Sequence, residues 1–346
     1  ENDACDWKHI LTTGKGKVNA HLEGTGITRK HPNIEMNYVG RKFSDVVRGI
    51  ELKCPVYKTI EDGQEQRYLV EEPEAHLHPQ YQNTFFEYLN ELQSKGLQIF
   101  VTSHSPTITA KSDVNNISVL QREQSIIQSF SFDELSEVDY PKESKRHLRK
   151  FLDTTKAQLF FANGVLLVEG VAEAIIIPIL AKKFLTEKID LCKSGIELVN
   201  IGGVAFNHFG LLFNNDDERK RLLSKCAIIT DSDPKDDGDI SDRAQKAKDL
   251  EKHNLKVCLA PHTLEHDLFE QSERNKTIMR EVYRNMHTQT DDLRGDFNVS
   301  TLMGKLKSNK DKAEFALQLY DRLEKEEAFD VPDYIKDAIL FVVPTE

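Results

Sequence analysis

The stretch that decides the fold is Val-Leu-Leu-Val-Glu-Gly-Val-Ala-Glu, residues 165–173. Its apolar start predicts a buried strand at Val165–Val168, and the run from about Ala172 to Phe184 predicts a helix. Glu169 ends the strand and Glu173 falls on the first helical turn, so both carboxylates can face one point above the sheet. The pattern predicts a strand-to-helix unit with two acids at its junction.

A second pair of acids follows a later strand, Ala227–Thr230, in the sequence Ile-Thr-Asp-Ser-Asp. Asp231 and Asp233 are two residues apart, and side chains at that spacing share a face of an extended chain. Four acids at the carboxyl edge of one sheet repel each other strongly unless cations are present. Oxygen ligands of this kind suit hard divalent ions, so we expect Mg²⁺ or Mn²⁺ there.

Strands and helices alternate around these acids. Further elements are expected at Glu197–Ile201 (strand) and Phe206–Phe213 (helix), and this alternation indicates a mostly parallel sheet covered by helices. From about Asp267 the pattern is helical. The last element, near 338–343, reads as a strand or a helix, and the preceding Pro332 favours the helix.

An earlier stretch, Tyr-Leu-Val-Glu-Glu at 68–72, is also an apolar, strand-like run that ends in acidic residues. It places Glu71 and Glu72 at the carboxyl end of a strand, where α/β sheets bind ligands. A helix at about Pro79–Ser94 and a strand at Gln98–Thr102 complete a βαβ unit. Paired glutamates suit magnesium-nucleotide hydrolysis, although an isolated pair is more often solvated.

Composition limits the class of protein. With 346 residues, the chain has room for about two domains, and 39% hydrophobic with 30% charged residues is typical of a globular protein. No apolar run reaches the roughly 18 residues of a membrane span, so we expect a cytoplasmic protein with no membrane contact. The net charge of -11 excludes bulk attraction of nucleic acid, so a nucleic-acid enzyme must recruit cations locally. Five scattered cysteines, an odd number, predict neither disulfides nor a zinc site.

The run Glu-Glu-Pro-Glu-Ala-His-Leu-His-Pro from Glu71, with Thr-Ser-His-Ser-Pro from Thr102, resembles the Walker B, D-loop and H-loop of ABC-type ATPases. More narrowly, it resembles the OLD (overcoming lysogenization defect) family. The resemblance implies that Glu71 binds magnesium, Glu72 is the catalytic base and His104 senses the terminal phosphate of ATP. No G-x-x-x-x-G-K-[ST] loop occurs, so we expect either a P-loop before Glu1 in the intact protein or a degenerate ATPase half.

The second half is similar to the TOPRIM domain of OLD nucleases. Its motifs are Leu-Val-Glu-Gly-x-x-Glu, then Ile-Gly-Gly at 201–203, then Ile-Thr-Asp-Ser-Asp. The resemblance implies that Glu169 is a general acid/base or first metal ligand, that the aspartates hold metals and that the glycines let the backbone pass close to the site. Thr-Leu-Glu-His-Asp-Leu at 263–268 resembles a stretch that adds a ligand for a second metal.

In that stretch Glu265 is the candidate ligand, and Asp267 is an alternative helix cap. Lys312, with Lys310 as runner-up, matches a lysine that would neutralise transition-state charge. The implied catalytic set is Glu169, Glu173, Asp231, Asp233, Glu265 and Lys312, of which all but the lysine would bind two metals. His262 and His266 have the i, i+4 spacing of a zinc pair, but their hard-acid surroundings argue against zinc.

The predicted architecture is α/β: the later half of an ABC-type ATPase domain at 1–150, then a TOPRIM domain at 151–346 with a helical region from about 267. The predicted function is metal-dependent DNA cleavage gated by nucleotide, similar to the nuclease of Gabija-type anti-phage systems. That resemblance also implies a homodimer or homotetramer through the ATPase domain and a helicase partner. The rivals are a non-catalytic clamp or sensor and a TOPRIM topoisomerase or primase.

Overall fold

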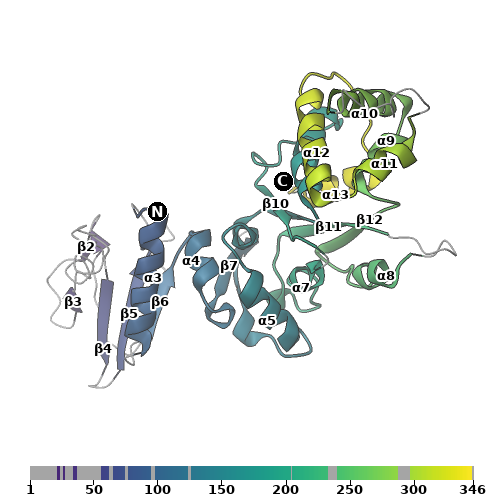
Figure 1. The fold of residues 1–346 in the computed structure, drawn as a ribbon. Helices are drawn as coiled ribbons and strands as arrows, with labels where there is room; N and C mark the ends of the chain where they lie inside the picture. Colours follow the sequence, from purple (N-terminus) through teal and green to yellow (C-terminus); the bar gives the residue numbers. More distant parts are fainter. Residues whose placement is uncertain are drawn as a thin grey trace. The chain divides into compact units, whose positions relative to one another are not determined.

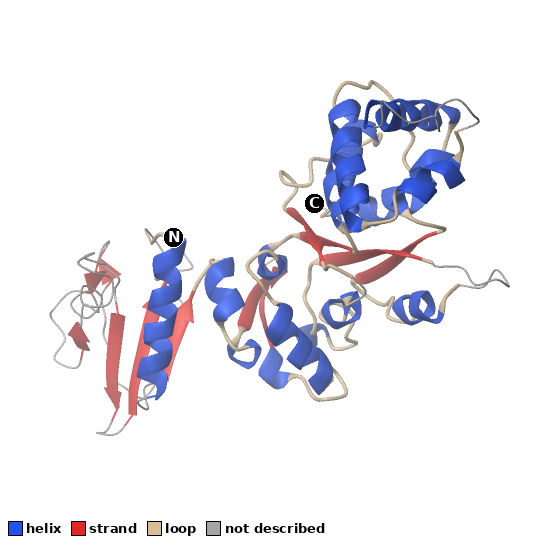
Figure 2. Ribbon diagram, viewed as in Figure 1, coloured by secondary structure: helices blue, strands red, loops and turns tan. Residues whose placement is uncertain are grey.

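The computed structural model describes residues 22–23, 26–27, 34–36, 56–61, 65–74, 77–94, 98–123, 126–203, 205–232, 240–286 and 297–344. The chain divides into two compact units, Glu1–Ser112 and Asp113–Glu346. Each unit has its own sheet and helices (Figures 1 and 2). Among the helices of these ranges, none combines the length and the apolar character needed to cross a membrane.

The sheet of the first unit has the order β3-β4-β5-β6. Strands β3 (Ile34–Met36), β4 (Val56–Glu61) and β5 (Glu65–Glu71) pair antiparallel, whereas β6 (Gln98–Thr102) lies parallel to β5. Helix α3 (Pro79–Ser94) connects the parallel pair, and α4 (Pro106–Lys111) follows β6. Two short strands, β1 (Leu22–Glu23) and β2 (Gly26–Ile27), form a separate antiparallel pair. The predicted βαβ unit is confirmed.

The sheet of the second unit has the order β10-β9-β11-β12, and every pairing in it is parallel. Its strands are β9 (Gly164–Val168), β10 (Ile196–Asn200), β11 (Lys225–Asp231) and β12 (Leu255–Ala260). All five residues of β9 are buried, as a strand covered on both faces requires. The predicted parallel sheet is confirmed, but the sequence analysis did not include β12 at its edge.

Helices cover both faces of this sheet (Figure 1). The core on one face joins the sheet to the helices α6 (Val171–Ile179), α9 (Leu264–Glu270), α10 (Glu273–Met286), α11 (Val299–Lys305), α12 (Asn309–Leu323) and α13 (Asp333–Val342). The opposite face carries the shorter helices α7 (Phe206–Gly210) and α8 (Asp242–Lys248). The last element is therefore a helix, as the position of Pro332 favoured.

Two details of these helices matter for the site. Helix α6 continues into a π-helical turn at Leu180–Phe184, just after Pro178, which cannot donate the hydrogen bond of a regular helix. The segment after β12 is helical from α9 onward, as expected from about Asp267. Helices α9 to α12 thus form an insert whose first and last members, α9 and α12, carry two of the predicted site residues.

Residues 113–150 belong to the second unit, which differs from the predicted boundary at 150. They form the hairpin β7 (Ser118–Glu123) and β8 (Ile126–Ser131) and most of helix α5 (Lys142–Phe151). The side chain of Gln121 accepts a hydrogen bond from the amide of Leu223 at 2.6 Å, and the Tyr140 hydroxyl donates to the carbonyl of His208. These contacts tie the segment to the chain before β11.

A test of this attachment is the substitution Asp139→Asn. The carboxylate of Asp139 accepts hydrogen bonds from Asn215 (3.0 Å), Ser136 (2.7 Å) and Lys220 (2.9 Å). These partners hold the pKa of Asp139 well below its ordinary value of 3.8. We expect the variant to lower the free energy of unfolding by about 2 kcal/mol at pH 7, measured by urea denaturation.

The sign of the pH dependence follows from the lowered pKa. The contribution of Asp139 is fully present above the pKa of the unfolded chain, near 3.8, and is lost as the pH falls toward the folded pKa. The difference between wild type and variant therefore shrinks below about pH 4. Asp133→Asn, at an exposed acid, is the control; equal losses in the two variants would contradict the attachment.

Candidate functional site

Two neighbouring parallel strands bring the first acids together. Strand β9 pairs with β11 so that Val168 lies beside Ile229, and the next residues, Glu169 and Thr230, therefore lie at the same edge. The Thr230 hydroxyl donates a hydrogen bond to Oε1 of Glu169. Asp231 ends β11 one residue later. The structure thus places Glu169 and Asp231 at one carboxyl edge, as predicted.

Glu173 turns back toward this edge from the first turn of α6. Gly170 is the N-cap of that helix, and a Cβ built on it would lie 2.8 Å from Oε2 of Glu173. The carboxylate therefore lies against the residue that follows Glu169. Burial raises the pKa of Glu173, and the negative charges of Glu265 and Glu169 raise it further. Three glutamates thus share one electrostatic environment.

Glu265 and Lys312 meet from two helices of the insert. Glu265 is buried on α9, and its Oε2 lies 3.3 Å from Nζ of Lys312 on α12. Among the described residues, no hydrogen-bond donor satisfies that oxygen. The charge of Lys312 also lowers the pKa of Glu173, opposing the effect of the acids. Lys310, the runner-up, is exposed, so the contact with the acids falls to Lys312.

The structure describes the first aspartate of the second pair, Asp231, but not the second, Asp233. Asp231 is half-buried, whereas Asp233 lies outside the described residues. Between them, the buried Ser232 donates its amide to the carbonyl of Ala260 at 2.8 Å and its hydroxyl to that of Pro261 at 2.7 Å. The end of β11 is therefore fixed to the end of β12.

Two residues at the site were missed by sequence reasoning. Arg243, on α8, places Nη2 3.4 Å from Oε1 of Glu169. The hydroxyl of Tyr334, on α13, is buried and has no hydrogen-bond partner in the described part of the chain. Neither residue stands in a motif, and both come from elements far along the chain, so no signal in the sequence pointed to them.

The raised pKa of Tyr334 shows which acids lie near its hydroxyl. Its pKa is raised well above the ordinary value, first by burial and then by the negative charges of four carboxylates. Those carboxylates belong to Asp267, Asp231, Glu173 and Glu265. The unpartnered hydroxyl therefore lies within the field of acids contributed by β11, α6 and α9.

The donor set fits hard divalent cations. The described acids at this edge are Glu169, Glu173, Asp231 and Glu265. Arg243 contacts Glu169, and Lys312 contacts Glu265. Carboxylate oxygens are the ligands that Mg²⁺ and Mn²⁺ prefer, so the residues present fit that metal class.

The glycine pair serves backbone conformation. Gly202 and Gly203 have φ of +72° and +130°, where residues with a Cβ are strained. The Gly203 amide donates to the carbonyl of Glu169 at 3.0 Å, which joins the turn after β10 to the site. A Cβ at either glycine would meet nothing within 4 Å, so conformation, and not a close backbone approach, requires them.

The first unit brings its own predicted residues together. Glu71 ends β5, and Glu72 follows in the left-handed region with φ of 41°, which is rare for a non-glycine residue. Oε1 of Glu72 lies 3.3 Å from Nε2 of His104. Glu74, which sequence reasoning did not single out, accepts the His104 amide at 2.6 Å. The predicted base and the predicted sensor therefore lie in contact.

Each of the two units contains a segment that matches a known protein family. A profile of the overcoming lysogenization defect protein-like TOPRIM domain matches residues 160–233, and one of an AAA ATPase domain matches 33–109. The Old nuclease of Escherichia phage P2 is 28% identical over 46% of this chain and 28% of its own length. The endonuclease GajA of Bacillus cereus (strain HuB5-5) is 28% identical over 52% of this chain and 28% of its own.

The chain thus contains an OLD-like TOPRIM domain and an ATPase segment, which confirms the resemblance. It spans under a third of the length of the curated relatives named above. The C-terminal region of the Burkholderia pseudomallei OLD protein is 20% identical, with a TM-score of 0.40 over 53% of this chain and 97% of that structure.

The packing of Glu173 against Gly170 makes Gly170→Ala a test of the site. The new methyl group would displace the carboxylate of Glu173, while the extended backbone of Gly170 (φ −140°) accepts alanine. We expect Mn²⁺ affinity, followed by electron paramagnetic resonance, to fall about tenfold, with an unfolding midpoint close to wild type. Gly304→Ala, where a Cβ meets nothing, is the control; an unchanged affinity in Gly170→Ala would exclude Glu173 from the metal site.

Proposed function

We propose that this chain is the nuclease part of a metal-dependent DNA endonuclease of the OLD type. The observation that carries the proposal is the convergence of acids from β9, β11, α6 and α9 at one sheet edge. A metal-free hydrolase would need a protein nucleophile with a base beside it, and the polar groups at this edge are dominated by carboxylates.

The residues divide into roles by position. Glu169 and Asp231, from adjacent strand ends, would hold a first ion, with Asp233 beside them. Glu265 and Glu173 would hold a second. Bound there, such ions would supply an activated water and charge stabilisation for the departing 3′ oxygen of a phosphodiester. Arg243 orients the carboxylate of Glu169 by its 3.4 Å contact.

Lys312 would contact the phosphate of the DNA at the point of cleavage. Its Nζ lies 3.3 Å from Oε2 of Glu265. Ions bound at the acids would neutralise Glu265, so the ammonium group becomes available to a phosphate oxygen and to the charge that grows in the transition state. The negative surface of the chain makes such local cations necessary for any contact with DNA.

Nucleotide control would come from the first unit. Glu71 would hold magnesium, Glu72 would act as base on the attacking water, and His104 would report the terminal phosphate. The 3.3 Å contact between Glu72 and His104 and the strained backbone of Glu72 support this assignment. The G-x-x-x-x-G-K-[ST] pattern of a P-loop does not occur in this sequence, so the assignment concerns magnesium, the attacking water and the terminal phosphate only.

The wider setting follows from the relatives. Because they are named nucleases and one is an endonuclease, we take DNA as the substrate and phage defence in the cytoplasm as the role. Assembly as a homodimer or homotetramer through the ATPase domains, and a helicase partner, complete the proposal. The rival is a clamp or sensor whose acids bind no catalytic metal.

Plasmid nicking with Mg²⁺ or Mn²⁺ tests the catalytic proposal. Asp231→Asn and Glu173→Gln keep the shape of the side chains and remove one metal ligand each. We expect the rate of cutting to fall by about 100-fold or more. Glu173→Gln should also keep or gain stability, because it removes a buried charge.

The control for both variants is Glu187→Gln, at an exposed acid, which should cut as wild type does. If wild type cuts and the two site variants cut equally well, the acid cluster is not the active site. If wild type leaves DNA intact with every metal and nucleotide tried, the clamp replaces the nuclease.

Nucleotide control is tested separately with Glu72→Gln and His104→Ala in the intact protein. We expect both variants to lose any change in cutting rate that ATP causes while retaining the cutting seen without nucleotide, because both residues belong to the nucleotide site proposed for the first unit and not to the acid cluster proposed to cut DNA. Glu87→Gln, at an exposed acid on α3, is the control. A normal response to ATP in both variants would remove Glu72 and His104 from the nucleotide site.

A further inference from the structure

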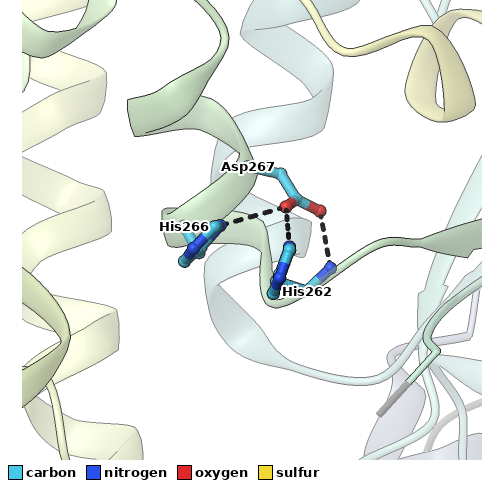
Figure 3. Close-up of side chains that lie close together, drawn as sticks. All are labelled: His262, His266 and Asp267. Atoms are coloured by element: carbon cyan, nitrogen blue, oxygen red, sulfur yellow. Dashed lines mark hydrogen bonds and ion pairs between the residues drawn. The ribbon is translucent and has the colours of Figure 1, made fainter. Parts of the chain in front are cut away.

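A second set of potential metal ligands lies on the loop after β12 and on α9. His262, His266 and Asp267 each offer one ligand atom, and these atoms all lie within 4.8 Å of one another. Figure 3 shows both imidazole rings turned toward the carboxylate of Asp267. The sequence presented only the histidine pair, and the fold adds a third ligand.

The distances suit a shared ion. Nδ1 of His262 and Nδ1 of His266 each lie 3.3 Å from the same atom, Oδ1 of Asp267. A hydrogen bond between nitrogen and oxygen is usually about 2.9–3.0 Å long, so both contacts are long for hydrogen bonds. Two ligands about 2.0–2.1 Å from a tetrahedral zinc ion are about 3.3 Å apart.

The two rings also lie next to each other. The two imidazoles stack with centroids 3.9 Å apart and an interplanar angle of 25° (Figure 3). Nδ1 of each ring faces Oδ1 of Asp267, and binding of one ion by both nitrogens requires the stacked rings to tilt, because each lone pair lies in the plane of its ring. His262 is half-exposed, with 51% of its side-chain surface accessible, so solvent can supply a further ligand and the ion has an entry path.

Burial of the Asp267 carboxylate also favours a bound metal ion. Only 8% of the side-chain surface of Asp267 is accessible, and within the described residues its ion-pair partners are the two histidines. A buried carboxylate is stable when it is paired or coordinates a metal. A divalent ion bound by the three side chains would balance the charge of this carboxylate.

We propose that His262, His266 and Asp267 bind a transition-metal ion, Zn²⁺ foremost, beside the acid cluster. Imidazole nitrogen selects zinc-like ions, whereas Mg²⁺ prefers oxygen, so the two sites take different metals. The ion would clamp the loop after β12 to α9 and so fix the turn that carries Glu265. The proposal is independent of the proposed nuclease activity.

The competing explanation is that Asp267 is only a cap. Its Oδ2 accepts a hydrogen bond from the backbone amide of His262 at 3.2 Å, which by itself closes the loop onto the helix. That contact uses one carboxylate oxygen and leaves Oδ1 to the two histidines. The two explanations differ in whether Zn²⁺ binds.

Calorimetric titration of the full chain with Zn²⁺ in excess Mg²⁺ tests the proposal. We expect one Zn²⁺ per chain that Mg²⁺ does not displace, and His262→Ala and His266→Ala should each weaken it by about 100-fold. His253→Ala is the matched control. Nε2 of His253 also contacts an aspartate, since it lies 2.7 Å from Oδ1 of Asp216, but neither residue belongs to the proposed zinc site. Asp231→Asn should leave Zn²⁺ binding unchanged.

Equal Zn²⁺ affinity in wild type and both site variants would overturn the proposal. Loss of Zn²⁺ in Asp231→Asn, or displacement by Mg²⁺, would place the ion in the acid cluster and overturn it too. Co²⁺ provides a readout that needs no variant: a Co²⁺ complex of wild type should show the intense visible absorption of tetrahedral coordination with nitrogen ligands. A spectrum of octahedral all-oxygen Co²⁺ would contradict the proposed site.

Discussion

The parallel pairing of β9 with β11 is the constraint on which the site depends. Because Val168 lies beside Ile229, Glu169 and Asp231 leave the sheet at one edge, and the Thr230 hydroxyl joins the two strand ends. A shift of one residue would break the contact between Thr230 and Glu169, because successive side chains of a strand point to opposite faces of the sheet. The neighbouring strand β12 adds to this alignment, since the amide of Ser232 binds the carbonyl of Ala260 and brings the start of α9 near the same edge.

Charge is the second constraint, because the fold gathers several carboxylates at one edge of the sheet. Glu173 and Glu265 are held in a buried environment, which raises the pKa of Glu173, and the Tyr334 hydroxyl lies unpartnered in the same field among the described residues. Holding such groups together costs stability unless a cation compensates. A fully buried strand and a large apolar core lie beside these groups and stabilise the fold that holds them.

Much of the fold could be predicted from the sequence, since hydrophobic strands alternate with amphipathic helices and the acids stand at strand ends, as at Glu169 and Glu71. Strand β12 was missed because its alternation is weak and it lies at the edge of the sheet. The domain boundary differs because the attachment of residues 113–150 depends on long-range contacts such as that of Gln121 with Leu223, which no local pattern encodes. For the same reason Arg243 and Tyr334 could not be foreseen, whereas the contact of Lys312 with Glu265 matches a motif-based expectation.

Manganese anomalous diffraction from crystals of this chain grown with Mn²⁺ tests most directly whether the converging acids form a metal site. The predicted result is anomalous density in contact with the carboxylates of Glu169 and Asp231, with a second peak toward Glu173 and Glu265. Both peaks should lie at positions distinct from that of any ion held by His262 and His266. Ordered carboxylates at this edge without anomalous density, in crystals where Mn²⁺ occupies other positions, would contradict a metal site built by the pairing of β9 with β11.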